Sequence, residues 1–160
     1  MKQKELSVAL KGIVILCLLA GIVLCCIVVP ELGLDAAASL PEYAWMFWPC
    51  LTFVFVTCIP VLIVLVLVWQ MANRIGVDNS FCFENATALK QICTLACIDM
   101  ALYVVAAVVG FFLMGGLHPF LLLFLFLILC IGTAVAVVAA ALSHIVHKGA
   151  ELQAEQDLTI

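Results

Sequence analysis

Long stretches without a charged side chain dominate this sequence. Three of them, of 19, 31 and 48 residues, lie between Lys11 and Glu31, between Glu42 and Arg74, and between Asp99 and Lys148. A helix rises 1.5 Å per residue, so about 20 apolar residues cross the ~30 Å hydrocarbon core of a bilayer. The whole chain is 68% hydrophobic and only 10% charged, whereas soluble domains carry about 25% charged residues. The sequence therefore predicts an all-α integral membrane protein.

The longest stretch is too long for one helix. It is interrupted at 114–119 by the residues MGGLHP, whose glycines and proline predict a tight turn. The segment from Met100 to Leu113 covers only about 21 Å, so the third helix has to begin before Asp99. We expect a single four-helix bundle over 1–160, in which Pro60 kinks the second helix. The predicted helices are 10–29, 43–71, 86–113 and 119–147, with a short tail at 148–160.

All six basic residues fall on one side of these predicted helices. They are Lys2, Lys4, Lys11, Arg74, Lys90 and Lys148. Because loops rich in lysine and arginine stay in the cytoplasm, we expect both termini there, in a multi-pass protein of the cytoplasmic membrane. Six basic residues are too few for a nucleic-acid surface, so direct nucleic-acid binding is not expected.

Asp99 is the most unusual residue, because it is a carboxylic acid within a predicted membrane helix. It shares a helix face with Tyr103 and with small residues, which allow close contact with a neighbouring helix. If the last two helices fold symmetrically about Gly116, Asp99 is level with Thr133, a candidate hydroxyl donor. An unpaired carboxylate is costly in hydrocarbon, so we expect Asp99 to be neutral and to hydrogen-bond to that helix. A proton-coupled or cation-binding site and a structural hydrogen bond remain alternatives.

The nine cysteines are interpreted as small apolar packing residues. Their number is odd and no disulfide framework spacing occurs, so no disulfide is expected. His144 and His147 lie one helical turn apart, as do Cys93 and Cys97. The same symmetric folding puts the histidines about a turn or more from Cys93, so we expect neither zinc nor any other cofactor.

Two stretches near the predicted cytoplasmic face are distinctive: FCFENATALKQI at 81–92 and AELQAEQDLTI at 150–160. Together with Pro30, Pro60 and the four-helix plan, they resemble a bacterial, mainly Gram-positive, membrane family called domain of unknown function 2975 (DUF2975). The resemblance covers essentially the whole chain and implies no activity that can be transferred. The resemblance does suggest a partner. In this family the genes often lie beside genes for small Cro-like helix-turn-helix regulators. Members usually have serine where this chain has Cys82.

A contact surface for such a partner is predicted around the start of the third helix and the tail. The residues concerned are Phe81, Phe83, Glu84, Lys90, Lys148, Asp157 and Leu158. We expect the fourth helix to continue through about Gln153 despite Gly149, because the segment lacks proline and is rich in helix formers. Leu158 and Ile160 then either fold back onto the two phenylalanines or wait for a partner.

The leading hypothesis is a non-enzymatic membrane regulator or sensor that contacts a cytoplasmic protein while embedded in the lipid bilayer. The alternative is a small transporter or immunity-type protein that uses Asp99 in a polar cleft. An intramembrane redox enzyme ranks last, because the sequence has no CxxC pair and no cofactor motif. Assembly into a homo-oligomer is left open.

Overall fold

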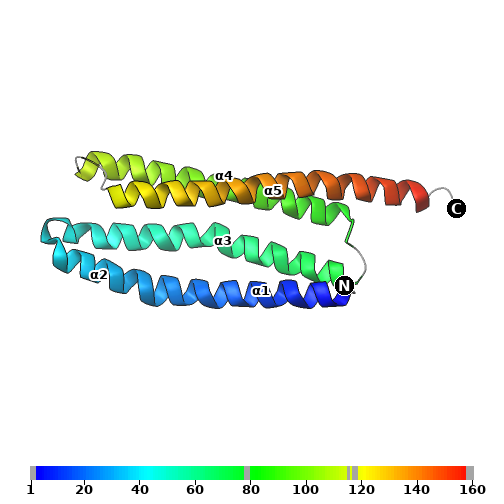
Figure 1. The fold of residues 1–160 in the computed structure, drawn as a ribbon, viewed down its shortest axis with the longest axis horizontal. Coiled ribbons are helices and arrows are strands. Elements are labelled where there is room, and N and C mark those ends of the chain that lie inside the picture. Colours follow the sequence, from blue (N-terminus) through cyan, green and yellow to red (C-terminus); the bar gives the residue numbers. More distant parts are fainter. Residues whose placement is uncertain (1–2, 78–79, 115, 117–118, 158–160) are drawn as a thin grey trace. The chain divides into compact units, whose positions relative to one another are not determined.

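The chain forms two helical hairpins. The computed structural model describes residues 3–77, 80–114, 116 and 119–157, and the regular structure among these residues is helical throughout. These described residues form four helices long and apolar enough to cross a membrane, which confirms the predicted class. The chain divides into two compact units, one ending at Gly76 and the other beginning at Val77 (Figure 1). We call them the first and second hairpins.

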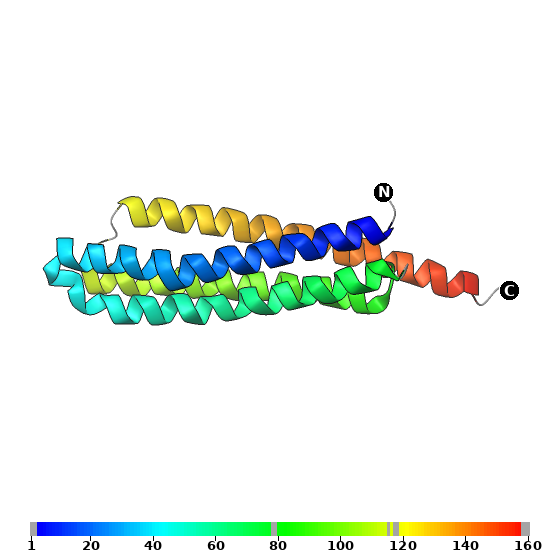
Figure 2. The same cartoon turned by 90° about the horizontal axis from the view of Figure 1, so that it is seen from below.

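The first arm of the first hairpin is longer than predicted. Helix α1 (Gln3–Val23), the π-helical turn η1 (Leu24–Val28) and helix α2 (Val29–Ser39) follow one another without interruption (Figure 2). Proline lacks an N–H and clashes with the carbonyl four residues earlier, so a regular helix does not pass Pro30 unchanged. Just before Pro30, the π turn changes the backbone hydrogen bonds from a spacing of four residues to five. The Val29 amide accordingly donates to the Leu24 carbonyl. The predicted helix end at residue 29 is therefore wrong.

The second arm begins after a short break at Leu40. A 3₁₀ turn, η2 (Pro41–Met46), leads into helix α3 (Phe47–Gly76), which contains Pro60. The Phe47 ring packs closely against α2 at Gly33. A Cβ added to Gly33 would lie 2.8 Å from this ring, so only glycine allows the ring to approach so closely. Both arms extend beyond their predicted limits, and the connection between them is correspondingly short.

Polar contacts fix the first hairpin near the end that carries Lys11 and Arg74. The Ser7 hydroxyl donates to the Ala72 carbonyl over 2.6 Å. The Lys11 amine lies 5.6 Å from the centre of the Trp69 ring, within cation–π range. The two contacts link α1 to α3 about one helical turn apart and in the same register, so they fix the alignment of the two arms.

The second hairpin consists of α4 (Phe83–Met114) and α5 (Pro119–Asp157), which run antiparallel (Figure 1). Met100 packs against Gly132, and each lies 16 residues from Gly116. A Cβ added to Gly132 would lie 2.6 Å from the Met100 Cγ, so the glycine provides the space for this side chain. The contact confirms the symmetric pairing expected from a turn at Gly116.

Helix α5 continues well past the apolar segment and ends at Asp157. This confirms the predicted continuation of the fourth helix through Gln153, despite Gly149. The third helix begins at Phe83, three residues before the predicted start. The prediction of a single domain over the whole chain stays a prediction.

Small residues make the closest helix contacts in each hairpin. The buried side chains include Ala72 in the first hairpin and Ala86, Ala88, Ala139 and Ala150 in the second. Many large apolar side chains instead are exposed, as an exposure of 78% for Phe112 illustrates, although Leu89 and Ile92 on α4 are buried. Small residues allow backbones to approach closely, while lipid is a suitable solvent for exposed apolar side chains. Each hairpin is therefore built for a membrane rather than around a large core of its own.

Candidate functional site at the basic end of the second hairpin

The basic end of the second hairpin is the end that holds Lys90 and Lys148. Here α4 begins in a well-ordered first turn, where the Cys82 carbonyl accepts hydrogen bonds from the amides of Asn85 and Ala86 at 3.1 and 3.2 Å. The Asn85 side chain is 1% exposed and donates to the Ser80 carbonyl over 3.0 Å. The Cys82 side chain is buried. Asn85 therefore holds the chain that leads into α4 by bonding back to Ser80.

Two aromatic contacts join the start of α4 to α5. The ring of Phe81 lies over Gly149, where an added Cβ would be 2.5 Å from the Phe81 Cδ1. The rings of Phe83 and His147 meet edge to face, with their centres 5.3 Å apart. These contacts place both phenylalanines against α5 on the C-terminal side of Ser143. They are anchors of the α5 continuation as well as members of the predicted contact surface.

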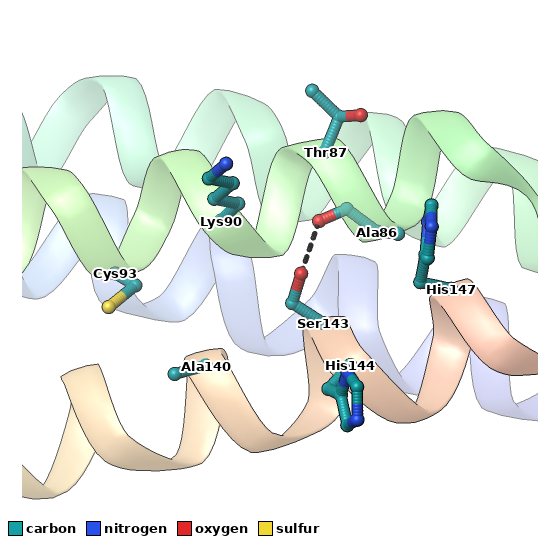
Figure 3. Close-up of a pocket in the computed structure, with 8 residues that line it drawn as sticks. All are labelled: Ala86, Thr87, Lys90, Cys93, Ala140, Ser143, His144 and His147. Carbon is teal, nitrogen blue, oxygen red and sulfur yellow. Dashed lines mark hydrogen bonds between the residues drawn. The ribbon is translucent and has the colours of Figure 1, made fainter.

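A cavity of about 460 Å³ lies between the two helices at this end (Figure 3). The lining residues from α4 are Ala86, Thr87, Lys90 and Cys93. Those from α5 are Ala140, Ser143, His144 and His147. The Ser143 hydroxyl donates to the Ala86 carbonyl over 2.8 Å, as the dashed line in Figure 3 shows. This hydrogen bond links α4 to α5 at the edge of the cavity.

The cavity is lined by groups that favour polar or anionic contacts. Lys90 carries a positive charge at neutral pH, and the two imidazoles become cationic when protonated. His147 Nε2 also lies 3.4 Å from Glu151 Oε1, so protonation of this histidine would create an ion pair within α5. No group of three histidine, cysteine or carboxylate side chains with metal-binding geometry occurs among the described residues.

Asp99 lies outside this cavity, deeper along α4. Its Oδ1 atom is buried and has no hydrogen-bond partner among the residues that the structure describes. The predicted donor, Thr133, instead donates from its hydroxyl to the Leu129 carbonyl over 2.7 Å and contacts the Met100 sulfur at 3.6 Å. Thr133 therefore does not donate to Asp99 as expected, whereas the broader expectation that one oxygen of Asp99 bonds to a neighbouring helix stays a prediction. Tyr103 follows one turn later on α4 and is half-buried.

The predicted contact surface is brought together only in part. Glu84, Lys90 and Lys148 are exposed, and the structure gives no ion pair between Glu84 and Lys148. Asp157 is the last residue of α5. Leu158 and Ile160 lie outside the described residues, so their expected folding onto Phe81 and Phe83 stays a prediction.

Sequence reasoning missed two residues that organise this end, Ser143 and Asn85. A signal for Ser143 was available, because it is a lone serine that follows a long apolar run within two turns of Lys148. In such a segment a hydroxyl commonly bonds to a backbone carbonyl or a neighbouring helix. The bond from Asn85 to Ser80 had no comparable signal, since it depends on the path of the loop before α4.

The last turns of α5 form an ordered polar surface. The segment 151–156 is helical and its side chains are exposed. Glu151 and Glu155 lie one turn apart, and Leu152 beside them is an apolar side chain with 62% exposure. An exposed apolar residue between acidic ones suits contact with a basic protein surface. We call 148–157 the α5 extension.

Comparison with known proteins gives a family and one relative of similar length. The model of the family described as "Protein of unknown function (DUF2975)" matches residues 31–160. The chain is also 25% identical over 158 residues to the "Uncharacterized membrane protein YoaS" of Bacillus subtilis (strain 168). That alignment covers 98% of this chain and 94% of the relative. No solved structure matches.

Proposed function

This chain belongs to the DUF2975 family of membrane proteins, and from that premise we propose that it is a non-enzymatic membrane regulator or sensor. In this proposal it lies in the cytoplasmic membrane of a bacterium with both termini inside, as the one-sided distribution of its six basic residues favours. The α5 extension then projects into the cytoplasm. It binds a protein there, and a small helix-turn-helix regulator is the partner that the family resemblance suggests.

The observation that carries the proposal is the ordered α5 extension. Helix α5 runs unbroken to Asp157, and its anchor is the packing of Phe81 on Gly149. A helix already formed before binding loses less conformational entropy on association than a disordered tail. DNA-binding proteins carry basic surfaces, so the acidic pair Glu151 and Glu155 offers them a complementary charge.

Capture of a partner by the intact protein tests this function. The protein would be purified from its native membrane in mild detergent, and the co-purifying proteins would be identified by mass spectrometry. We expect a small soluble protein with a basic surface. The double variant Glu151→Gln/Glu155→Gln should lower its capture by about tenfold, because two charge contacts of roughly 0.7 kcal/mol each are lost.

A matched control removes the same charge elsewhere. Glu31 and Glu42 lie on either side of the connection in the first hairpin, at the end away from Lys11. The variant Glu31→Gln/Glu42→Gln should leave capture unchanged. Equal capture by all three proteins, or equal loss in both variants, would show that the α5 extension does not recognise the partner.

The transporter alternative has one observation in its favour, the buried and unpartnered Oδ1 of Asp99. A transported ion or proton needs a polar path to that carboxylate. The cavity at the basic end is lined on α4 as far as Cys93, six residues before Asp99, and Asp99 is not part of its lining. The regulator therefore remains the better-supported function.

A further inference from the structure

Two cysteines from different helices meet inside the first hairpin. Cys25 lies in the π turn η1 and Cys58 in α3, and their sulfur atoms are 3.1 Å apart. Neither sulfur is part of a disulfide, and both side chains are partly buried. A disulfide needs an S–S distance of about 2.05 Å, so the sulfurs have to approach by only about 1 Å. Because η1 and α3 belong to the two separate arms, such a bond would cross-link the hairpin.

The backbone around this pair is irregular on both sides. The Val29 amide bonds to Leu24 across the π turn that holds Cys25. Pro60, two residues after Cys58, lacks the amide that would continue the hydrogen-bond ladder of α3. π turns occur frequently at functional positions.

A small apolar cavity is lined by both cysteines. Its volume is about 190 Å³, and its lining includes Cys25, Cys58, Cys26 and Phe55. Cys25 lies 14 residues beyond Lys11 and Cys58 lies 16 residues before Arg74, or about 21 and 24 Å along the helices. The pair is therefore within the hydrocarbon region, where a reagent must dissolve in lipid to reach it.

We propose that Cys25 and Cys58 form a reversible redox pair that is oxidised to a disulfide by a lipid-soluble quinone. In this reaction both S–H bonds break and one S–S bond forms. The quinone accepts the two electrons and the two protons and leaves as the quinol. The disulfide joins the π turn of the first arm to α3 next to Pro60, and a thiol reductant reverses it.

The other close pair of cysteines provides an internal comparison. Cys93 and Cys97 lie one turn apart on the same helix, α4. Positions four apart on a helix have Cβ atoms about 5–6 Å apart, whereas a disulfide requires about 3.5–4.5 Å. The Cys93–Cys97 pair should therefore stay reduced under conditions that oxidise Cys25 and Cys58.

The test counts thiols in the full chain reconstituted in phospholipid vesicles. The protein is incubated with a fully ring-substituted, lipid-soluble benzoquinone, which has no free ring position to which a thiol can add. It is then denatured and alkylated with maleimide, and its intact mass is measured. We expect nine adducts without quinone, two fewer with quinone, and nine again after dithiothreitol. Peptide mapping should find Cys25 linked to Cys58.

Serine variants identify the pair. Cys25→Ser and Cys58→Ser should each keep all their remaining thiols in the presence of quinone. Cys26→Ser, the control from the same π turn, should lose two, as the unaltered chain does. Nine adducts from the unaltered chain with quinone, or a disulfide that maps to other cysteines, would overturn the proposal. Because this result comes from the unaltered chain, it does not depend on whether the variants fold.

Discussion

The contact between Phe81 and Gly149 allows a quantitative prediction about what holds the α5 extension in place. Glycine in a helix interior costs about 1 kcal/mol relative to alanine. Gly149→Ala would therefore stabilise α5 if nothing lay beside it. The new Cβ, however, would be 2.5 Å from the Phe81 Cδ1, which is closer than real Cβ contacts. The Phe81 ring has to move away.

The cost of moving the ring follows from its burial. Phe81 is 45% exposed, so slightly more than half of its surface is covered. Complete burial of phenylalanine contributes about 1.5–3 kcal/mol, so displacement of this ring loses roughly 1–1.5 kcal/mol. Gain and loss nearly cancel, and we expect Gly149→Ala to change the free energy of unfolding by less than about 0.5 kcal/mol.

A double-mutant cycle separates the two effects. In a Phe81→Ala background the ring is absent, and Gly149→Ala should stabilise the protein by about 1 kcal/mol. The coupling energy between the two positions should therefore be about 1 kcal/mol. Unfolding of the four proteins in mixed micelles with increasing denaturing detergent would measure it. Additive effects, with a coupling near zero, would show that Phe81 does not anchor α5.

Four further predictions follow from other features of the chain. A reporter fused to the C-terminus should be active only when the reporter works in the cytoplasm, and activity of an extracytoplasmic reporter would contradict the proposed orientation. Asp99→Asn should leave the melting temperature nearly unchanged, and loss of function in a protein that still folds would show that Asp99 must ionise. Ser143→Ala and, in the first hairpin, Ser7→Ala should each lower the free energy of unfolding by about 0.6 kcal/mol, as is typical of hydrogen bonds between membrane helices. No change in either variant would show that these hydroxyl hydrogen bonds do not stabilise the hairpins. Deletion of 157–160 should leave melting unchanged but reduce partner capture, whereas a lower melting temperature would show that the tail folds back.

The helix count could be predicted because charge and turn residues mark the helix ends. The register of the second hairpin was also predictable, since the glycine-rich turn at 115–116 fixes which residues share a depth, and Met100 accordingly meets Gly132. The first hairpin offered no such marker. The first predicted helix ended at residue 29, just before the charge at Glu31, whereas the structure continues past Pro30 after a π turn. The meeting of Cys25 and Cys58 therefore could not be deduced from spacing.

Depth along a helix is easier to predict than rotation about its axis. The turn at Gly116 put Asp99 level with Thr133, but the structure brings Met100 into contact with Gly132 and Thr133. Successive residues on a helix differ by about 100° in direction, so a shift by one residue replaces a carboxylate with a thioether. This explains why the depth was correct although the Thr133 hydroxyl donates within its own helix rather than to Asp99. Sequence periodicity predicts which side chains of a helix face its neighbour only when one side of the helix is clearly more polar than the other.

The two proposals concern different hairpins, and this makes them separable. The α5 extension belongs to the second hairpin and the Cys25–Cys58 pair to the first. Glu151→Gln/Glu155→Gln should therefore leave quinone-dependent loss of thiols unchanged, and Cys25→Ser should leave partner capture under reducing conditions unchanged. Capture that differs between the oxidised and reduced forms of the unaltered chain, but not of Cys25→Ser, would require a coupling free energy between the two hairpins. That single comparison would distinguish a redox sensor from a regulator whose disulfide serves only to stabilise its first hairpin.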